Sequence, residues 1–165
     1  MVKSVIYHLI IRDTPILEKT MTTRCDTTLV VSTGKSYPGK TSPIYSFQKD
    51  LGGELHHLNL STLIPEADPE NKEWRLKNWG TTEEIDIDYI ESDVIVAGEY
   101  YLRFMTTETP IVPWVKTVAS LYPELTFHLD YFNVVLGFEG ELEIQGDTVF
   151  FEEQKEIKVD AGTRS

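Results

Sequence analysis

The segment EYYLRFMTTETPIVPWVKTVASLYPELTFHLDY, residues 99 to 131, decides the fold because it places a helix pattern between two strand patterns. Apolar residues alternate or run together over strand length from Glu99 to Met105 and again from Leu125 to Tyr131. Between them, Thr109-Pro110 opens a helix in which apolar side chains recur every three or four residues, and Pro123 closes it. The segment therefore predicts a strand, a helix and a second strand.

Hairpin patterns flank this unit on both sides. Upstream, residues 84 to 91 alternate between acidic and apolar side chains, and Ala97-Gly98 supplies a turn before the strand at Glu99. Downstream, residues 137 to 144 and 148 to 152 indicate two strands joined by a short turn. Strands joined by hairpins, with helices between some of them, predict an α+β fold with an antiparallel sheet and helices packed on one face.

The first half of the chain gives weaker patterns. We expect a strand at residues 4 to 12 and a helix from Thr14 to about Arg24. Residues 25 to 57 are rich in glycine and proline and predict a loop-rich insertion with one or two short strands. Residues 58 to 81 predict an ordered loop with one helical turn. The whole is expected to be one domain over residues 1 to 160, followed by a tail at 161 to 165.

The chain is strongly acidic: 27 aspartates and glutamates against 15 lysines and arginines give its 165 residues a formal net charge of -12. This charge repels nucleic-acid phosphates and anionic membrane surfaces, so we expect neither as a direct partner. Cys25 is the only cysteine, and the N-terminal residues lack the apolar run of an export signal or membrane span. These features predict a cytoplasmic protein that favours basic partners, or one whose acidity only maintains solubility.

Four motifs follow one another along the chain: Asn78-Trp79-Gly80-Thr81, Phe104-Met105-Thr106 ahead of Pro110, Pro123-Glu124-Leu125-Thr126-Phe127, and Gly137-Phe138-Glu139-Gly140-Glu141. In order and spacing they resemble the YubB-type ferredoxin-like proteins of phages and plasmids over residues 58 to 152. The resemblance implies a ferredoxin-like sheet with two helices on one face, whose first βα unit would come from the N-terminal strand and helix. It also implies an accessory protein of a mobile genetic element in a bacterial host. Thr82 and Thr107-Glu108 depart from the family's usual Lys and Ala-Trp, so no contact of those residues is carried over.

Acidic residues alternate with apolar ones in two of the predicted strands. In extended geometry each strand gathers its carboxylates on one face: Glu84, Asp86 and Asp88 in the first, and Glu139, Glu141 and Glu143 in the second. If both strands belong to one sheet, its open face is a field of carboxylates that fits a basic nucleic-acid-binding groove. With the resemblance, this predicts an inhibitor of a host defence protein, of the anti-CRISPR or anti-restriction type. The alternative is a solvated strand face that charge protects from edge pairing.

Residues 34 to 41, GKSYPGKT, match the nucleotide-binding pattern GxxxxGK[ST]. The residues that would bind phosphate and Mg²⁺ are Gly34, Gly39, Lys40 and Thr41. Pro38 removes one backbone N–H from the loop, and Pro43 interrupts the helix that should follow. A P-loop-like nucleotide-binding protein is therefore the second hypothesis, and a non-catalytic regulatory module of the mobile element is the third.

The sequence shows no signature of an enzyme. Cys25 is expected in a loop, without an evident histidine partner. His56 and His57 are adjacent and would point to opposite faces of a strand, while the apolar neighbours of His8 and His128 indicate strand residues. We therefore predict no catalytic residue, no cofactor and no metal site.

Overall fold

The computed structural model describes residues 24–34, 37, 42–51, 58–85, 91–93 and 99–157. These residues form a six-stranded antiparallel sheet in the order β2-β3-β1-β4-β5-β6, together with helices α3 to α6. The strands are β1 (Arg24–Ser32), β2 (Glu91–Asp93), β3 (Glu99–Thr107), β4 (Thr126–Asn133), β5 (Phe138–Gln145) and β6 (Thr148–Glu156). The helices are α3 (Pro43–Asp50), α4 (Leu60–Leu63), α5 (Lys72–Asn78) and α6 (Val112–Leu121).

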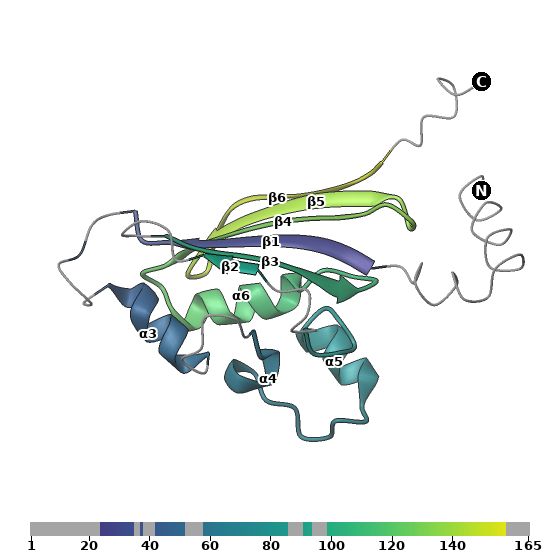
Figure 1. The fold of residues 1–165 in the computed structure, drawn as a ribbon, viewed down its shortest axis with the longest axis horizontal. Coiled ribbons are helices and arrows are strands. Elements are labelled where there is room, and N and C mark those ends of the chain that lie inside the picture. The colour runs from purple at the N-terminus through teal and green to yellow at the C-terminus, as the bar shows by residue number, and fades with distance from the viewer. Residues whose placement is uncertain are drawn as a thin grey trace, which may run out of the picture.

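The described helices all lie on one side of the sheet (Figure 1). The strands show the matching two-residue periodicity, since Cys25, Thr27, Leu29 and Val31 of β1 are buried while the residues between them are partly exposed. β3 and β4 alternate in the same way. One face of the sheet therefore forms the core with the helices. We name the opposite face, which no described helix covers, the open face.

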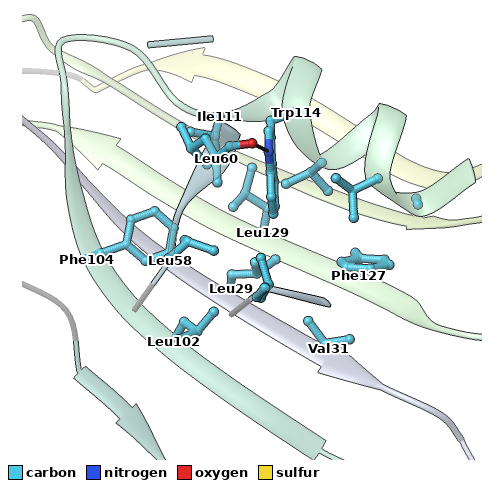
Figure 2. Close-up of a cluster of buried hydrophobic side chains, with 14 of the residues drawn as sticks. Leu29, Val31, Leu58, Leu60, Leu102, Phe104, Ile111, Trp114, Phe127 and Leu129 are labelled. Atoms are coloured by element: carbon cyan, nitrogen blue, oxygen red, sulfur yellow. Dashed lines mark hydrogen bonds between the residues drawn. The ribbon is translucent and has the colours of Figure 1, made fainter. Parts of the chain in front are cut away.

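Helix α6 ties the helical layer to the sheet. Its residues Trp114, Val115, Val118 and Ala119 are buried. The Trp114 indole N–H donates a hydrogen bond of 3.0 Å to the Leu60 carbonyl oxygen, which joins α4 to α6. Figure 2 shows this bond above buried side chains of β1, β3 and β4. A buried indole needs such a partner, so the bond both satisfies Trp114 and fixes the short helix α4.

The Asn78-Trp79-Gly80-Thr81 motif forms a turn between α5 and the loop that follows. Trp79 is buried, and its indole N–H donates to the Ile64 carbonyl oxygen at 2.9 Å. Gly80 has φ 93°, and a Cβ there would lie 2.1 Å from the Pro110 carbonyl oxygen, so glycine is required. The Thr81 hydroxyl accepts from the Thr107 backbone N–H at 3.2 Å. The motif is thus a structural joint between α5 and the end of β3.

The prediction from residues 99 to 131 is confirmed, because β3, α6 and β4 occupy this segment in that order. The hairpin predicted downstream is confirmed as β5 and β6, which pair antiparallel. The α+β class with an antiparallel sheet is confirmed with them. In the described part of the chain, no helix is long and apolar enough to cross a membrane.

The interpretation of residues 25 to 57 as a loop-rich insertion needs correction, although a strand is present there, as one or two short strands were expected. β1 lies inside the sheet between β3 and β4, and α3 follows it, capped by the Ser42 hydroxyl, which accepts from the Ile44 backbone N–H at 3.2 Å. Arg24 begins β1 instead of ending a helix, and Cys25 lies in this strand, not in a loop. The apolar alternation of β1 is hard to see because threonine, a good strand residue, occupies both of its faces.

Two further predictions need correction. Residues 58 to 81 hold two helices, α4 and α5, instead of one helical turn, and the Asn71 side chain caps α5 by accepting from the Trp74 backbone N–H at 3.0 Å. The strand predicted at 84 to 91 is wrong at its start, because Glu84 and Ile85 lie outside any strand. The strand predicted at residues 4 to 12 and nearly all of the helix after it lie outside the described residues, as does the predicted tail.

Candidate functional site

Acidic side chains gather on the open face where β4, β5 and β6 run side by side. Glu139, Glu141 and Glu143 alternate with residues of the core face such as Leu142 and Ile144, which are buried. The predicted common face of these three glutamates is therefore confirmed. Among the described open-face residues of these three strands, Lys155 is the only lysine or arginine.

The register places three of the carboxylates in one row across the sheet. Asp130 on β4 pairs with Glu141 on β5, and Glu141 pairs with Glu153 on β6. Neighbouring strands lie about 4.8 Å apart, and like charges directly opposite each other destabilise a sheet. The fold therefore holds this row, which we name the acidic row, against mutual repulsion.

A hollow of about 300 Å³ lies over this part of the open face. Its lining includes the three residues of the acidic row together with Asp26, Glu139, Phe132 and Lys155. The Lys155 ammonium lies 3.7 Å from a Glu139 carboxylate oxygen, and the Arg103 guanidinium lies 3.8 Å from Asp26. Lys155 is the only lysine or arginine in the lining, against five carboxylates, so a further cation would be favoured in the hollow.

His128 is the basic group nearest the acidic row. Its Nε2 lies 3.1 Å from Asp130 Oδ2 and 2.9 Å from Glu141 Oε2, and its Nδ1 lies 3.5 Å from Glu143 Oε1. One imidazole thus faces three carboxylates from two strands. The alternation of His128 and Asp130 along one strand was visible in the sequence, but the approach of Glu141 depends on the pairing of β4 with β5, which sequence patterns do not give.

Glu84 does not belong to the open face. Its two carboxylate oxygens accept hydrogen bonds from the backbone N–H groups of Leu60 at 2.7 Å and Ser61 at 3.0 Å. It therefore caps the start of α4 on the helical side of the sheet, where a negative charge stabilises the helix N-terminus. Asp86 and Asp88 lie outside the described residues, so their predicted role stays a prediction.

The predicted nucleotide-binding loop is described only at its start. Gly34 follows β1 with φ 73°, whereas Gly39, Lys40 and Thr41 lie outside the described residues. Helix α3 begins at Pro43 behind the Ser42 cap. β1 therefore precedes this segment and α3 follows it, but the residues that would hold the phosphates stay predictions.

Cys25 is not a candidate nucleophile. Its side chain is completely buried in the core, and burial raises the pKa of its thiol to about 12. A thiol acts as a nucleophile in its ionised form, which is absent near neutral pH at such a pKa. The open face therefore remains the best candidate for a functional surface.

No family model, curated protein or solved structure matches the chain.

Proposed function

We propose that this chain is a ferredoxin-like interaction protein of a phage or plasmid, whose open face binds a basic nucleic-acid-binding protein of the bacterial host and inhibits it. The acidic row of Asp130, Glu141 and Glu153 carries the proposal. A protein surface that keeps carboxylates directly opposite each other gives up stability, and a cationic partner restores it.

The strand order supports the ferredoxin-like part of the proposal. β1 and β2 both run antiparallel to β3, and β3 and β4 both run antiparallel to β1. The chain thus contains two pairs of parallel strands separated by helices, in the spatial order β2-β3-β1-β4. This order is consistent with a split βαβ fold in which β1, instead of the strand predicted at residues 4 to 12, is the first strand, and to which the hairpin β5–β6 adds two strands beyond β4.

The composition of the open face supports a basic protein as the partner. Phe132 on β4 and Phe151 on β6 are exposed at 40% and 43%, beside the carboxylates of β5. Exposed aromatic rings bind arginine side chains through their faces and serve as anchors in protein interfaces. Grooves that bind nucleic acid present many lysines and arginines, so they complement both the charge and the rings of this face.

The proposal is tested by reversing the charge of β5 without changing the fold. The tagged chain is used to capture proteins from a bacterial lysate over a salt series, and a stoichiometric partner is purified for calorimetry. Replacing Glu139, Glu141 and Glu143 together by lysine should abolish its binding. The interaction should also weaken as salt rises, because screening reduces charge-driven association. Inhibition is read from the partner's own nucleic-acid binding or cleavage.

The control variant carries the same change in net charge elsewhere. Glu70, Glu73 and Glu124 are exposed and lie on the helical side or in a loop, so their replacement by lysine should leave binding nearly unchanged. Circular dichroism checks that both variants are folded. Equal loss of binding in the two variants would show that net charge alone attracts the partner. Absence of any stoichiometric basic partner would remove the proposed function.

A further inference from the structure

His128, Asp130 and Glu141 bring three potential metal ligands together on the open face. One nitrogen of His128 and one oxygen from each carboxylate all lie within 4.8 Å of one another. Imidazole nitrogen suits Zn²⁺, Ni²⁺ and similar ions, and carboxylate oxygen completes many such sites. The ligand set is therefore mixed, and its histidine distinguishes it from a patch of acidic residues.

The two distances from the His128 nitrogen are close to those between ligands of a shared ion. Two ligand atoms that each lie about 2.1 Å from one metal, at angles between octahedral and tetrahedral values, are about 3.0 to 3.4 Å apart. His128 Nε2 lies 3.1 Å from Asp130 Oδ2 and 2.9 Å from Glu141 Oε2. Both oxygens converge on the same nitrogen, although a single N–H points well at only one acceptor. An ion bound between the nitrogen and the two oxygens would give all three atoms a common partner.

The sheet holds these ligands in place. His128 and Asp130 are two residues apart on β4 and point to the same face, and Asp130 and Glu141 are register partners on adjacent strands. Ligands carried by regular strands are positioned more firmly than ligands on loops. Glu143 Oε1 lies 3.5 Å from the other ring nitrogen, Nδ1, where a carboxylate commonly orients a histidine that binds metal through Nε2.

We propose that His128, Asp130 and Glu141 bind one divalent transition-metal ion of the Zn²⁺ class. The hollow beside them leaves the remaining coordination positions to water or to a donor group of a bound molecule. The ion also offsets the repulsion between Asp130 and Glu141. The site shares Asp130 and Glu141 with the acidic row but does not require a protein partner, and it departs from the prediction of no metal site.

The test is Zn²⁺ titration by calorimetry, with thermal unfolding followed in parallel. The chain has four histidines, so the experiment uses the full chain with the adjacent pair replaced, His56→Gln/His57→Gln. In this background one Zn²⁺ per chain should bind and raise the melting temperature, because an ion that binds the folded state stabilises it. His128→Gln should abolish both effects, and Asp130→Asn or Glu141→Gln should weaken binding at least about tenfold.

Glu139→Gln is the matched control, because it removes the same charge from the same strand and face without contact to His128. It should leave the affinity for Zn²⁺ within about twofold of the background, and Mg²⁺ should bind far more weakly than Zn²⁺. Equal weakening by Glu139→Gln and Glu141→Gln would indicate diffuse attraction and overturn the site. Undiminished Zn²⁺ binding by folded His128→Gln would overturn it as well. Binding of a basic protein is read separately in His128→Gln, which lacks one proposed metal ligand but keeps every carboxylate of the open face.

Discussion

On the helical side of the sheet each half-buried carboxylate has its own partner, whereas on the open face carboxylates face one another. Glu66 pairs with the Arg75 guanidinium, and Glu84 accepts two backbone N–H groups at the start of α4. Asp130, Glu141 and Glu153 instead occupy one row in three adjacent strands. The first arrangement satisfies every charge within the fold. The second leaves negative charge available to something outside it.

This difference separates acidic residues that serve the fold from those for which we propose a role in recognition. A carboxylate bonded to a helix terminus or an arginine stabilises the folded state, so removing it should cost stability. A carboxylate held against other carboxylates costs stability while it is present, so removing it should not. Net charge alone does not distinguish the two groups, but stability measurements on single variants do.

The largest expected effect compares one aromatic residue from each face. Trp114→Ala removes a completely buried ring and one of the two N–H donors to the Leu60 carbonyl oxygen, so it should lower the free energy of unfolding by about 3–5 kcal/mol. Phe132→Ala on the open face should cost under about 1 kcal/mol, because that ring is already 40% exposed. Urea denaturation followed by fluorescence or circular dichroism measures both.

Similar losses for the two variants would contradict the comparison. A large loss for Phe132→Ala would mean that this ring is covered, for example by a part of the chain outside the described residues. A small loss for Trp114→Ala would mean that α6 contributes little to the core. Trp114→Phe serves as a milder variant that keeps an apolar ring while removing the indole N–H.

The sequence predicts the unit from β3 to β4 because its periodicity changes from two to 3.6 and back between clear proline boundaries. It does not define β1, because Thr27 is buried while Thr28 faces the open side. Polar residues on both faces hide which positions of this strand point to the core. Glu84 shows a second limit. An alternating sequence indicates an extended chain, but whether that chain joins a sheet depends on residues distant in sequence. Here the Glu84 carboxylate instead accepts hydrogen bonds from the backbone at the start of α4.

The candidate site was predictable in part for the same reason. The common face of Glu139, Glu141 and Glu143 follows from strand geometry alone. The meeting of His128 with Glu141 requires the register of β4 on β5, which is a non-local property. A search for histidine and aspartate two residues apart in a predicted strand would have found two of the three proposed metal ligands.

A second prediction uses alkaline pH to probe the helix-covered face alone. Burial raises the pKa values of the Cys25 thiol and the Tyr131 phenol to about 12. The unfolded chain therefore loses these protons at lower pH than the folded chain, and stability should fall as pH rises above about 9. For Cys25 the slope is about 1.4 kcal/mol per pH unit until its folded pKa is reached.

The matched control for this prediction is Cys25→Ala. Its unfolding free energy, measured by urea denaturation between pH 8 and pH 11, should fall less steeply than that of the unchanged chain, by about 1.4 kcal/mol per pH unit above pH 9. The same slope in both proteins would show that Cys25 ionises as readily in the folded state as in the unfolded one. That result would contradict its place in the core.

The smallest effect gives the sharpest comparison, because it changes the same residue type in the same way on both sides of the sheet. Glu84→Gln keeps the shape of the side chain but weakens its bonds to the Leu60 and Ser61 N–H groups, so it should cost about 1–2 kcal/mol. Glu141→Gln relieves repulsion from Asp130 and Glu153 and weakens the exposed contact with His128, so its unfolding free energy should lie within about 0.5 kcal/mol of the unchanged chain or above it. Urea denaturation at low salt measures both, and added salt should shrink the difference. If Glu141→Gln lost as much unfolding free energy as Glu84→Gln, the open-face carboxylates would stabilise the fold. That result would contradict the proposal that these carboxylates are held for binding a partner.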